Sequence, residues 1–226
     1  MRGLRRRALL PAGAGLGKPI GGGLILKELP PRHRAGRVLW VVPAHIQKKW
    51  IRARRRFFDS ALWPADRRWV EGERRRLGEE ANIWDQDHQR MVTSQAFIRQ
   101  DEFQPALEEA FWDVVIVDEA HKAARRGTSP SKTSRVVERV ASNSDSLLLL
   151  SATPHDGKGE AFRSLIGYID PFLVAEEQEL PKEAVDRVMI RRGKQTLYDD
   201  DGDRIFPDRE VNTVPVAMAP DERQLY

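Results

Sequence analysis

Residues 114–121, V-V-I-V-D-E-A-H, decide the fold, because four hydrophobic residues in a row stop abruptly at two acids, an alanine and a histidine. An apolar run without alternation predicts a strand buried on both faces, as in a parallel sheet. Asp118 and Glu119 would then emerge at the carboxyl end of that strand, where open α/β sheets bind ligands. Such a pair suits phosphate chemistry, because one acid can hold Mg²⁺ through water while the other orients an attacking water. A strand that simply ends in solvated acids is the alternative at this point.

Other apolar runs predict the neighbouring strands of the same sheet. Residues 38–42, V-L-W-V-V, predict a buried strand that ends at Pro43, followed by a helix over 44–56 with Trp50 turned inward. Residues 147–150, L-L-L-L, predict a strand that runs directly into S-A-T-P-H-D-G. This alternation of strands and helices is typical of an α/β fold with a parallel sheet. Shorter elements are expected as strands at 7–10 and 91–94, and as helices at 98–111, 134–142 and 183–192.

The composition favours a cytosolic protein with one main domain and an appendage. The chain has 226 residues, 40% of them hydrophobic, which is enough to bury a substantial core. It contains no cysteine, which excludes disulfides and thiolate metal sites and fits a reducing compartment. No apolar run approaches the roughly 20 residues that span a bilayer, and the arginine-rich start has no signal-peptide core. We therefore expect a cytoplasmic protein without a membrane partner.

The charge is unevenly distributed along the chain. Residues 1–76 carry 20 Lys and Arg against 5 Asp and Glu, whereas residues 77–226 carry 18 against 29. A basic region of this kind is compatible with binding of nucleic-acid phosphates. The arginine cluster Arg52, Arg54, Arg55 and Arg56 is equally compatible with a solvated helix face. Tryptophans such as Trp63 are more often packed than stacked on bases.

A glycine-rich turn, P-A-G-A-G-L-G-K-P over residues 11–19, follows the first expected strand. Glycines let backbone N–H groups curl around phosphates, and a lysine adds positive charge, as in G-x-x-x-x-G-K-[ST]. Ala12 stands at the first glycine of that pattern, and Pro19 stands at its hydroxyl position. Because Pro19 has neither a hydroxyl ligand for Mg²⁺ nor a backbone donor, we expect weakened nucleotide binding. Taken alone, the turn is also compatible with an ordinary loop.

The order of these motifs resembles that of the superfamily two helicases, with G-L-G-K upstream, then D-E-A-H, then S-A-T. The V-V-P strand end with Trp50 behind it, D-E-A-H-K and S-A-T-P-H-D-G resemble the Swi/Snf-type DNA-dependent ATPases, especially bacterial members that act on RNA polymerase or in the DISARM phage-defence system. The resemblance continues through F-R-S-L-I-G-Y-I-D-P at 162–171, V-M-I-R-R at 188–192 and F-P-D-R-E-V from Phe206. It implies a P-loop NTPase with a RecA-like three-layer α/β/α fold and a mainly parallel sheet.

The resemblance also implies catalytic roles and the cofactors ATP and Mg²⁺. Lys18 would bind the β- and γ-phosphates, Asp118 would be the Mg²⁺ ligand through water, and Glu119 would position the hydrolytic water. The cofactor-binding residues would be Gly15, Leu16, Gly17, Lys18, Pro19 and His121.

The resemblance further implies a coupling segment and macromolecular partners. His121 would couple the nucleotide site to Ser151, Ala152 and Thr153, which would relay nucleotide state toward a DNA-facing surface. The partners would be duplex DNA and a second RecA-like lobe. An RNA-directed helicase is an alternative that P-H-D-G and V-M-I-R-R disfavour by the same resemblance.

For the domain organisation, we expect a first RecA-like lobe over residues 1–172, shortened at its start. Residues 173–226 are expected to form a linker helix, a turn and a strand that lead toward a second lobe absent from the chain. Loss of an arginine supplied by a second lobe typically costs about 10³ to 10⁵ in rate, so we expect this chain to be inactive alone. The open alternative is a non-catalytic remnant that binds DNA or a protein partner.

Overall fold

The computed structural model describes residues 7–11, 36–58, 61–85, 90–127, 129–152, 159–175 and 180–190. The chain divides into two compact units, Met1–Arg192 and Gly193–Tyr226, and every described residue belongs to the first. The glycine-rich turn from Gly15 to Pro19 lies outside the described residues, and so does Thr153. The expected lobe boundary at residue 172 stays a prediction.

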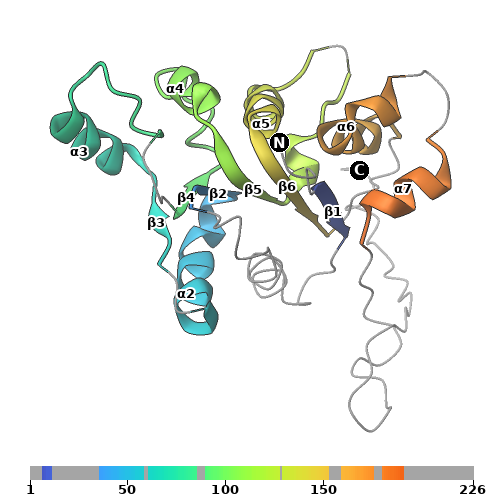
Figure 1. Cartoon of the computed structure of the whole chain (residues 1–226), viewed down its shortest axis with the longest axis horizontal. Helices are drawn as coiled ribbons and strands as arrows, with labels where there is room; N and C mark the ends of the chain where they lie inside the picture. The colour runs from blue at the N-terminus through green and yellow to red at the C-terminus, as the bar shows by residue number, and fades with distance from the viewer. Residues whose placement is uncertain are drawn as a thin grey trace, which may run out of the picture. The chain divides into compact units, whose positions relative to one another are not determined.

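A six-stranded parallel sheet lies at the core of the first unit, with the strand order β1-β6-β5-β2-β4-β3 (Figure 1). Its register brings the carboxyl ends of the strands to one edge: Pro11 pairs with Ser151, and Leu150 pairs with Asp118. The predicted parallel α/β fold is confirmed. The strands are β1 (Arg7–Pro11), β2 (Val38–Val42), β3 (Trp63–Pro64), β4 (Arg90–Ser94), β5 (Trp112–Asp118) and β6 (Ser144–Ser151).

Both faces of the central strands are buried, as their unbroken apolar runs predicted. Successive side chains of a strand point to opposite faces, so each run contributes to two separate cores. One core includes Leu39, Val41, Val115, Val117, Leu147 and Leu149. The other includes Val38, Trp40, Val42, Ile116, Leu148 and Leu150.

Helices on both faces of the sheet complete the three-layer α/β/α arrangement. Helices α4 (Gln104–Glu109), α5 (Lys132–Ser142) and α6 (Gly159–Ile169) cover one face, and α2 (Gln47–Phe58) lies on the other (Figure 1). None of the helices in the described ranges is long and apolar enough to cross a membrane. The remaining elements are η1 (Ala44–Ile46), α3 (Arg67–Leu77), η2 (Ala120–Ala123), η3 (Pro171–Val174) and α7 (Lys182–Val188).

The helix expected over residues 98–111 is shorter than predicted, because α4 begins only at Gln104. Pro105 occupies its first turn, where the missing N–H of proline removes no helical hydrogen bond. Upstream, Phe97 and Phe103 stack with their ring centroids 4.7 Å apart and are buried in the core. This packing favours consecutive turns over residues 95–103.

Most of the tryptophans pack in the interior, as expected from their usual role. Trp84 is fully buried and contacts Trp69 at 5.0 Å and Trp112 at 6.5 Å between ring centroids. Trp50 is turned inward from α2, with 1% of its surface exposed. Trp63 differs, because 64% of it is exposed on β3.

Candidate functional site

Asp118 is the last residue of β5, and its carboxylate is buried and oriented by two donors. The Trp50 indole Nε1–H donates to Asp118 Oδ2 at 2.9 Å, and the Glu119 backbone N–H donates to Asp118 Oδ1 at 2.8 Å. Only 3% of Asp118 is exposed, so these bonds act in a medium of low polarity. Hydrogen bonds to an ionised group are short and strong, and they fix the direction in which the carboxylate faces.

Glu119 turns the chain sharply at the edge of the sheet. Its φ of 51° and ψ of 46° place it in the left-handed region, and it is the single non-glycine residue with positive φ in the described part of the chain. This conformation costs a residue with a side chain about 1–2 kcal/mol. Strain of this kind is concentrated at functional sites. The turn leaves 24% of the Glu119 side chain exposed, next to the buried Asp118.

His121 lies between the acidic turn and the end of β6. Its Nδ1 is 3.4 Å from Glu119 Oε2 and 3.1 Å from Ser151 Oγ. Ser151 is fully buried at the carboxyl end of β6, and Ala152 follows it. The structure therefore brings Asp118, Glu119, His121 and Ser151 together, as the sequence predicted, while their roles stay predictions.

Gln95 is a site neighbour that sequence reasoning missed. Its side-chain Nε2 donates to the Asp118 carbonyl at 2.8 Å, and its backbone N–H donates to the Val42 carbonyl at 2.9 Å. Gln95 thereby ties together the carboxyl ends of β2, β4 and β5. The available signal was the polar T-S-Q that follows the apolar start of β4, at the same edge as the acids.

Tyr168 of α6 supports η2, the short helix that carries His121. Its hydroxyl donates to the Ala123 carbonyl at 3.0 Å and accepts a bond from the Ser134 hydroxyl at 2.7 Å. Burial raises the pKa of Tyr168 above its ordinary value. The phenol therefore stays protonated at neutral pH and keeps its donor. Sequence reasoning gave no sign of this contact, because it joins elements far apart in the chain.

The strand order places the start of the glycine-rich turn at the same edge as Asp118. The turn follows β1, and β6 alone separates β1 from β5. Neighbouring strands lie about 4.8 Å apart, so the ends of β1 and β5 are separated by about 10 Å. A triphosphate with its metal ion can bridge such a distance. The roles of Gly15, Leu16, Gly17, Lys18 and Pro19 stay predictions, because these residues lie outside the described ranges.

Known proteins resemble this chain in sequence and in fold. The family described as "Type III restriction enzyme, res subunit" matches residues 3–156. The RNA polymerase-associated protein RapA of Yersinia pestis (strain Pestoides F) is 32% identical over 202 residues, which cover 86% of this chain and 20% of the relative. RapA of Yersinia pseudotuberculosis serotype O:1b (strain IP 31758) matches with the same values. The chain thus spans about a fifth of the length of these curated relatives.

A solved structure has the same fold. The SWI2/SNF2 ATPase core of Sulfolobus solfataricus, in complex with dsDNA, superposes with a TM-score of 0.62 at 19% identity. The match covers 87% of this chain and 41% of the other. The agreement of the family match, the relatives and the fold leads to one assignment. The chain belongs to the family described as type III restriction enzyme, res subunit. It is similar in sequence to RapA, and it has the RecA-like fold of a SWI2/SNF2 ATPase core.

Proposed function

We propose that this chain is the ATP-binding lobe of a Swi/Snf-like DNA-dependent ATPase. The observation that supports this most is the buried carboxylate of Asp118, held by Trp50 and by the Glu119 N–H at the carboxyl edge of a parallel sheet. A ligand-binding crevice is expected at that edge. The family as a whole uses nucleotide and Mg²⁺, and the residues at this edge fit both.

Asp118 is suited to hold a hydrated Mg²⁺. Carboxylate oxygens are preferred Mg²⁺ ligands, and the ion usually keeps several waters while it binds one or two carboxylates and substrate phosphates. The Trp50 and Glu119 donors fix the direction in which this carboxylate faces. Bound Mg²⁺ would supply positive charge that neutralises the β- and γ-phosphate oxygens.

Glu119 would orient and activate the hydrolytic water. Its side chain is partly exposed beside Asp118, and its Oε2 lies 3.4 Å from His121 Nδ1. Lys18 and the backbone N–H groups from Gly15 to Lys18 would bind the phosphates. Pro19 supplies no hydroxyl ligand, so ATP would bind more weakly than in a chain with threonine at that position.

The contact between His121 and Ser151 would couple the site to the rest of the lobe. A change in the position of Glu119 during the reaction would act on His121 Nδ1, which is 3.4 Å away, and then on Ser151 at 3.1 Å. Ser151, Ala152 and Thr153 would carry this change toward bound DNA. The solved Sulfolobus relative is a complex with dsDNA, which supports duplex DNA as the partner of this chain.

A second RecA-like lobe, in cis or in trans, would complete the ATP site by supplying an arginine. Phosphoryl-transfer enzymes gain about 10³ to 10⁵ in rate from such an arginine. The RapA relatives are RNA polymerase-associated, which makes an association with RNA polymerase a further candidate for the whole protein.

Phosphate release measured with and without duplex DNA tests this proposal. The chain is assayed by itself and with a second RecA-like lobe of a relative supplied in trans. We expect release that needs the second lobe, rises with DNA and falls at least about 100-fold in Glu119→Gln, because a positioned base contributes 10²–10⁴. Release that is unchanged in Glu119→Gln would contradict the proposal. No release under any condition would favour the non-catalytic alternative.

A further inference from the structure

Helix α2 carries an unusual concentration of positive charge. Six of its twelve residues are lysine or arginine, and none is acidic. Five of the six side chains are exposed, and we name these five the cationic ridge: Lys48, Lys49, Arg52, Arg55 and Arg56.

The ridge residues lie on one side of the helix. A helix advances 100° and 1.5 Å per residue, so the five positions fall within an arc of about 120° and over a length of about 12 Å. The other side of the helix carries the buried Trp50 and Arg54. Burial and the charge of Arg90 lower the pKa of Arg54 to about 10, so it is still positive at neutral pH. The helix therefore presents one continuous positive surface away from the sheet.

Local charges do not balance the ridge. In the described part of the chain, none of the five ridge residues forms an ion pair with a carboxylate. Arg52 instead faces four like charges three or four residues away, and each such pair destabilises a helix. Helix α3 differs, because Arg74 pairs with Glu102 and Arg76 pairs with Glu73. A helix that only faces solvent gains nothing from clustered like charges, whereas a bound polyanion would neutralise them.

We propose that the cationic ridge binds the phosphate backbone of duplex DNA. The choice of DNA rests on the proposed function, whereas the polyanion-binding character rests on α2 itself. Duplex DNA carries one negative charge per about 1.7 Å, so a 12 Å length presents about seven charges to the five cations. Three of the five are arginines, whose planar guanidinium groups bind phosphate oxygens in pairs.

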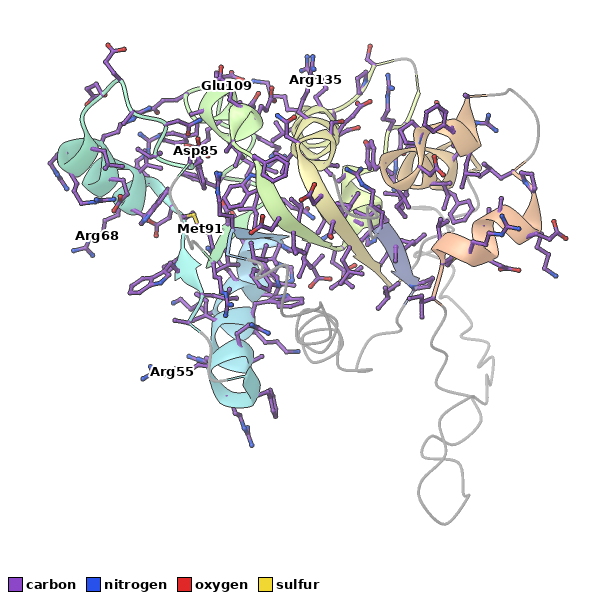
Figure 2. All side chains as sticks on the ribbon, in the orientation of Figure 1. Arg55, Arg68, Asp85, Met91, Glu109 and Arg135 are labelled. Atoms are coloured by element: carbon purple, nitrogen blue, oxygen red, sulfur yellow. The ribbon has the colours of Figure 1, made fainter. Side chains whose placement is uncertain are left out.

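The test compares the ridge with an equal charge on the opposite face of the sheet. Arg52→Gln/Arg55→Gln removes two ridge cations, and Arg135→Gln/Arg139→Gln removes two exposed arginines from α5. Figure 2 shows Arg55 projecting from α2 on one side of the sheet and Arg135 projecting from α5 on the other. Both variants have the same net charge and replace arginine with glutamine, a residue of similar helix propensity.

The readout is the anisotropy of a labelled mixed-sequence duplex of 20 base pairs, titrated with the full chain without nucleotide from 50 to 200 mM salt. Each phosphate contact contributes about 0.9 to the slope of log K against log salt. We expect the slope of the ridge variant to be smaller by about 1.8, which corresponds to about 60-fold weaker binding at 0.1 M salt. The α5 variant should retain the slope of the parent chain.

An equal loss in the two variants would overturn the proposal, because net charge and not the ridge would then determine binding. Absence of binding by the parent chain would also overturn it, as would tighter binding to an RNA duplex of the same sequence. The measurement needs no ATP. If the chain releases no phosphate but the ridge variant still has the smaller salt slope, the proposed ATPase activity is disproved and binding of DNA by the ridge is still supported.

Discussion

Replacing Trp50 with phenylalanine removes one hydrogen-bond donor from a buried carboxylate while keeping an aromatic ring in the same core. In the native structure the indole N–H donates to Asp118 Oδ2 at 2.9 Å, and 1% of Trp50 and 3% of Asp118 are exposed. A hydrogen bond to a charged group contributes about 1.5–3 kcal/mol. The phenylalanine side chain has three fewer heavy atoms than tryptophan, and the cavity left behind costs about 1 kcal/mol. We expect Trp50→Phe to lower the free energy of unfolding by about 2.5–4 kcal/mol.

Trp40→Phe is the matched control. Trp40 is also fully buried and belongs to the same core, but its Nε1 has no hydrogen-bond partner among the described residues. Removing an unsatisfied buried donor gains about 1–3 kcal/mol. This gain offsets the smaller ring and the loss of the contact with the Arg54 guanidinium, which lies 5.4 Å from the Trp40 ring. The net change should be close to zero.

Urea unfolding followed by far-ultraviolet circular dichroism measures both variants, since the signal does not depend on tryptophan fluorescence. We expect Trp50→Phe to be less stable than Trp40→Phe by at least about 2 kcal/mol, with the same dependence on urea concentration. Equal stabilities of the two variants would contradict this expectation, because the hydrogen bond to Asp118 would then contribute nothing beyond the packing of the Trp50 ring.

Three further predictions follow from the same structure. The free energy of unfolding of Glu119→Gly should be about 1 kcal/mol higher than that of Glu119→Ala, because both variants lack the carboxylate but only glycine accepts a φ of 51° without strain. Chemical denaturation measures both values, and a more stable alanine variant would contradict this expectation. Tyr168→Phe should cost about 1–3 kcal/mol at pH 7, because its buried partners lose a hydrogen bond. The pKa of Tyr168 is raised in the folded state, so above about pH 10 the unfolded chain loses the phenol proton first. The stability difference between the parent and Tyr168→Phe should therefore shrink there by up to about 1.4 kcal/mol per pH unit, and a stability difference that does not change with pH would contradict this. Arg52→Gln should raise the free energy of unfolding by about 1 kcal/mol, since it removes four like-charge pairs at once, whereas Arg135→Gln should leave it unchanged; a destabilised Arg52 variant would mean that the ridge is balanced within the fold.

The sequence predicted most of the sheet, because its strands are buried on both faces. Such strands need unbroken apolar runs, and V-L-W-V-V at 38–42 gave the bounds of β2 without error. The proximity of Asp118 to Ser151 could also be predicted, since the carboxyl ends of parallel strands meet at one edge of the sheet. The helix expected over 98–111 was wrong in its first half, because the stacking of Phe97 on Phe103 overrides a composition compatible with a helix.

The contacts that orient the site could not be read from the chain. Trp50 and Asp118 are separated by 68 residues, and Gln95 and Asp118 by 23, so no local pattern joins them. The inward direction of Trp50 was predicted, but its hydrogen bond depends on the distance between α2 and β5. The strained conformation of Glu119 is likewise a tertiary effect, because glutamate has no intrinsic preference for positive φ.

In the proposed ATP site, Lys18 and Asp118 hold one Mg²⁺-bound nucleotide between them. Calorimetric titration of Mg²⁺ and ATP into Pro19→Thr, with and without Asp118→Asn, tests it most directly, because threonine restores the missing ligand at the glycine-rich turn. The parent chain should bind ATP weakly, and Pro19→Thr should bind it at least about tenfold more tightly. Adding Asp118→Asn should remove the dependence of this binding on Mg²⁺. Mg²⁺-dependent binding that is unchanged by Asp118→Asn would contradict it.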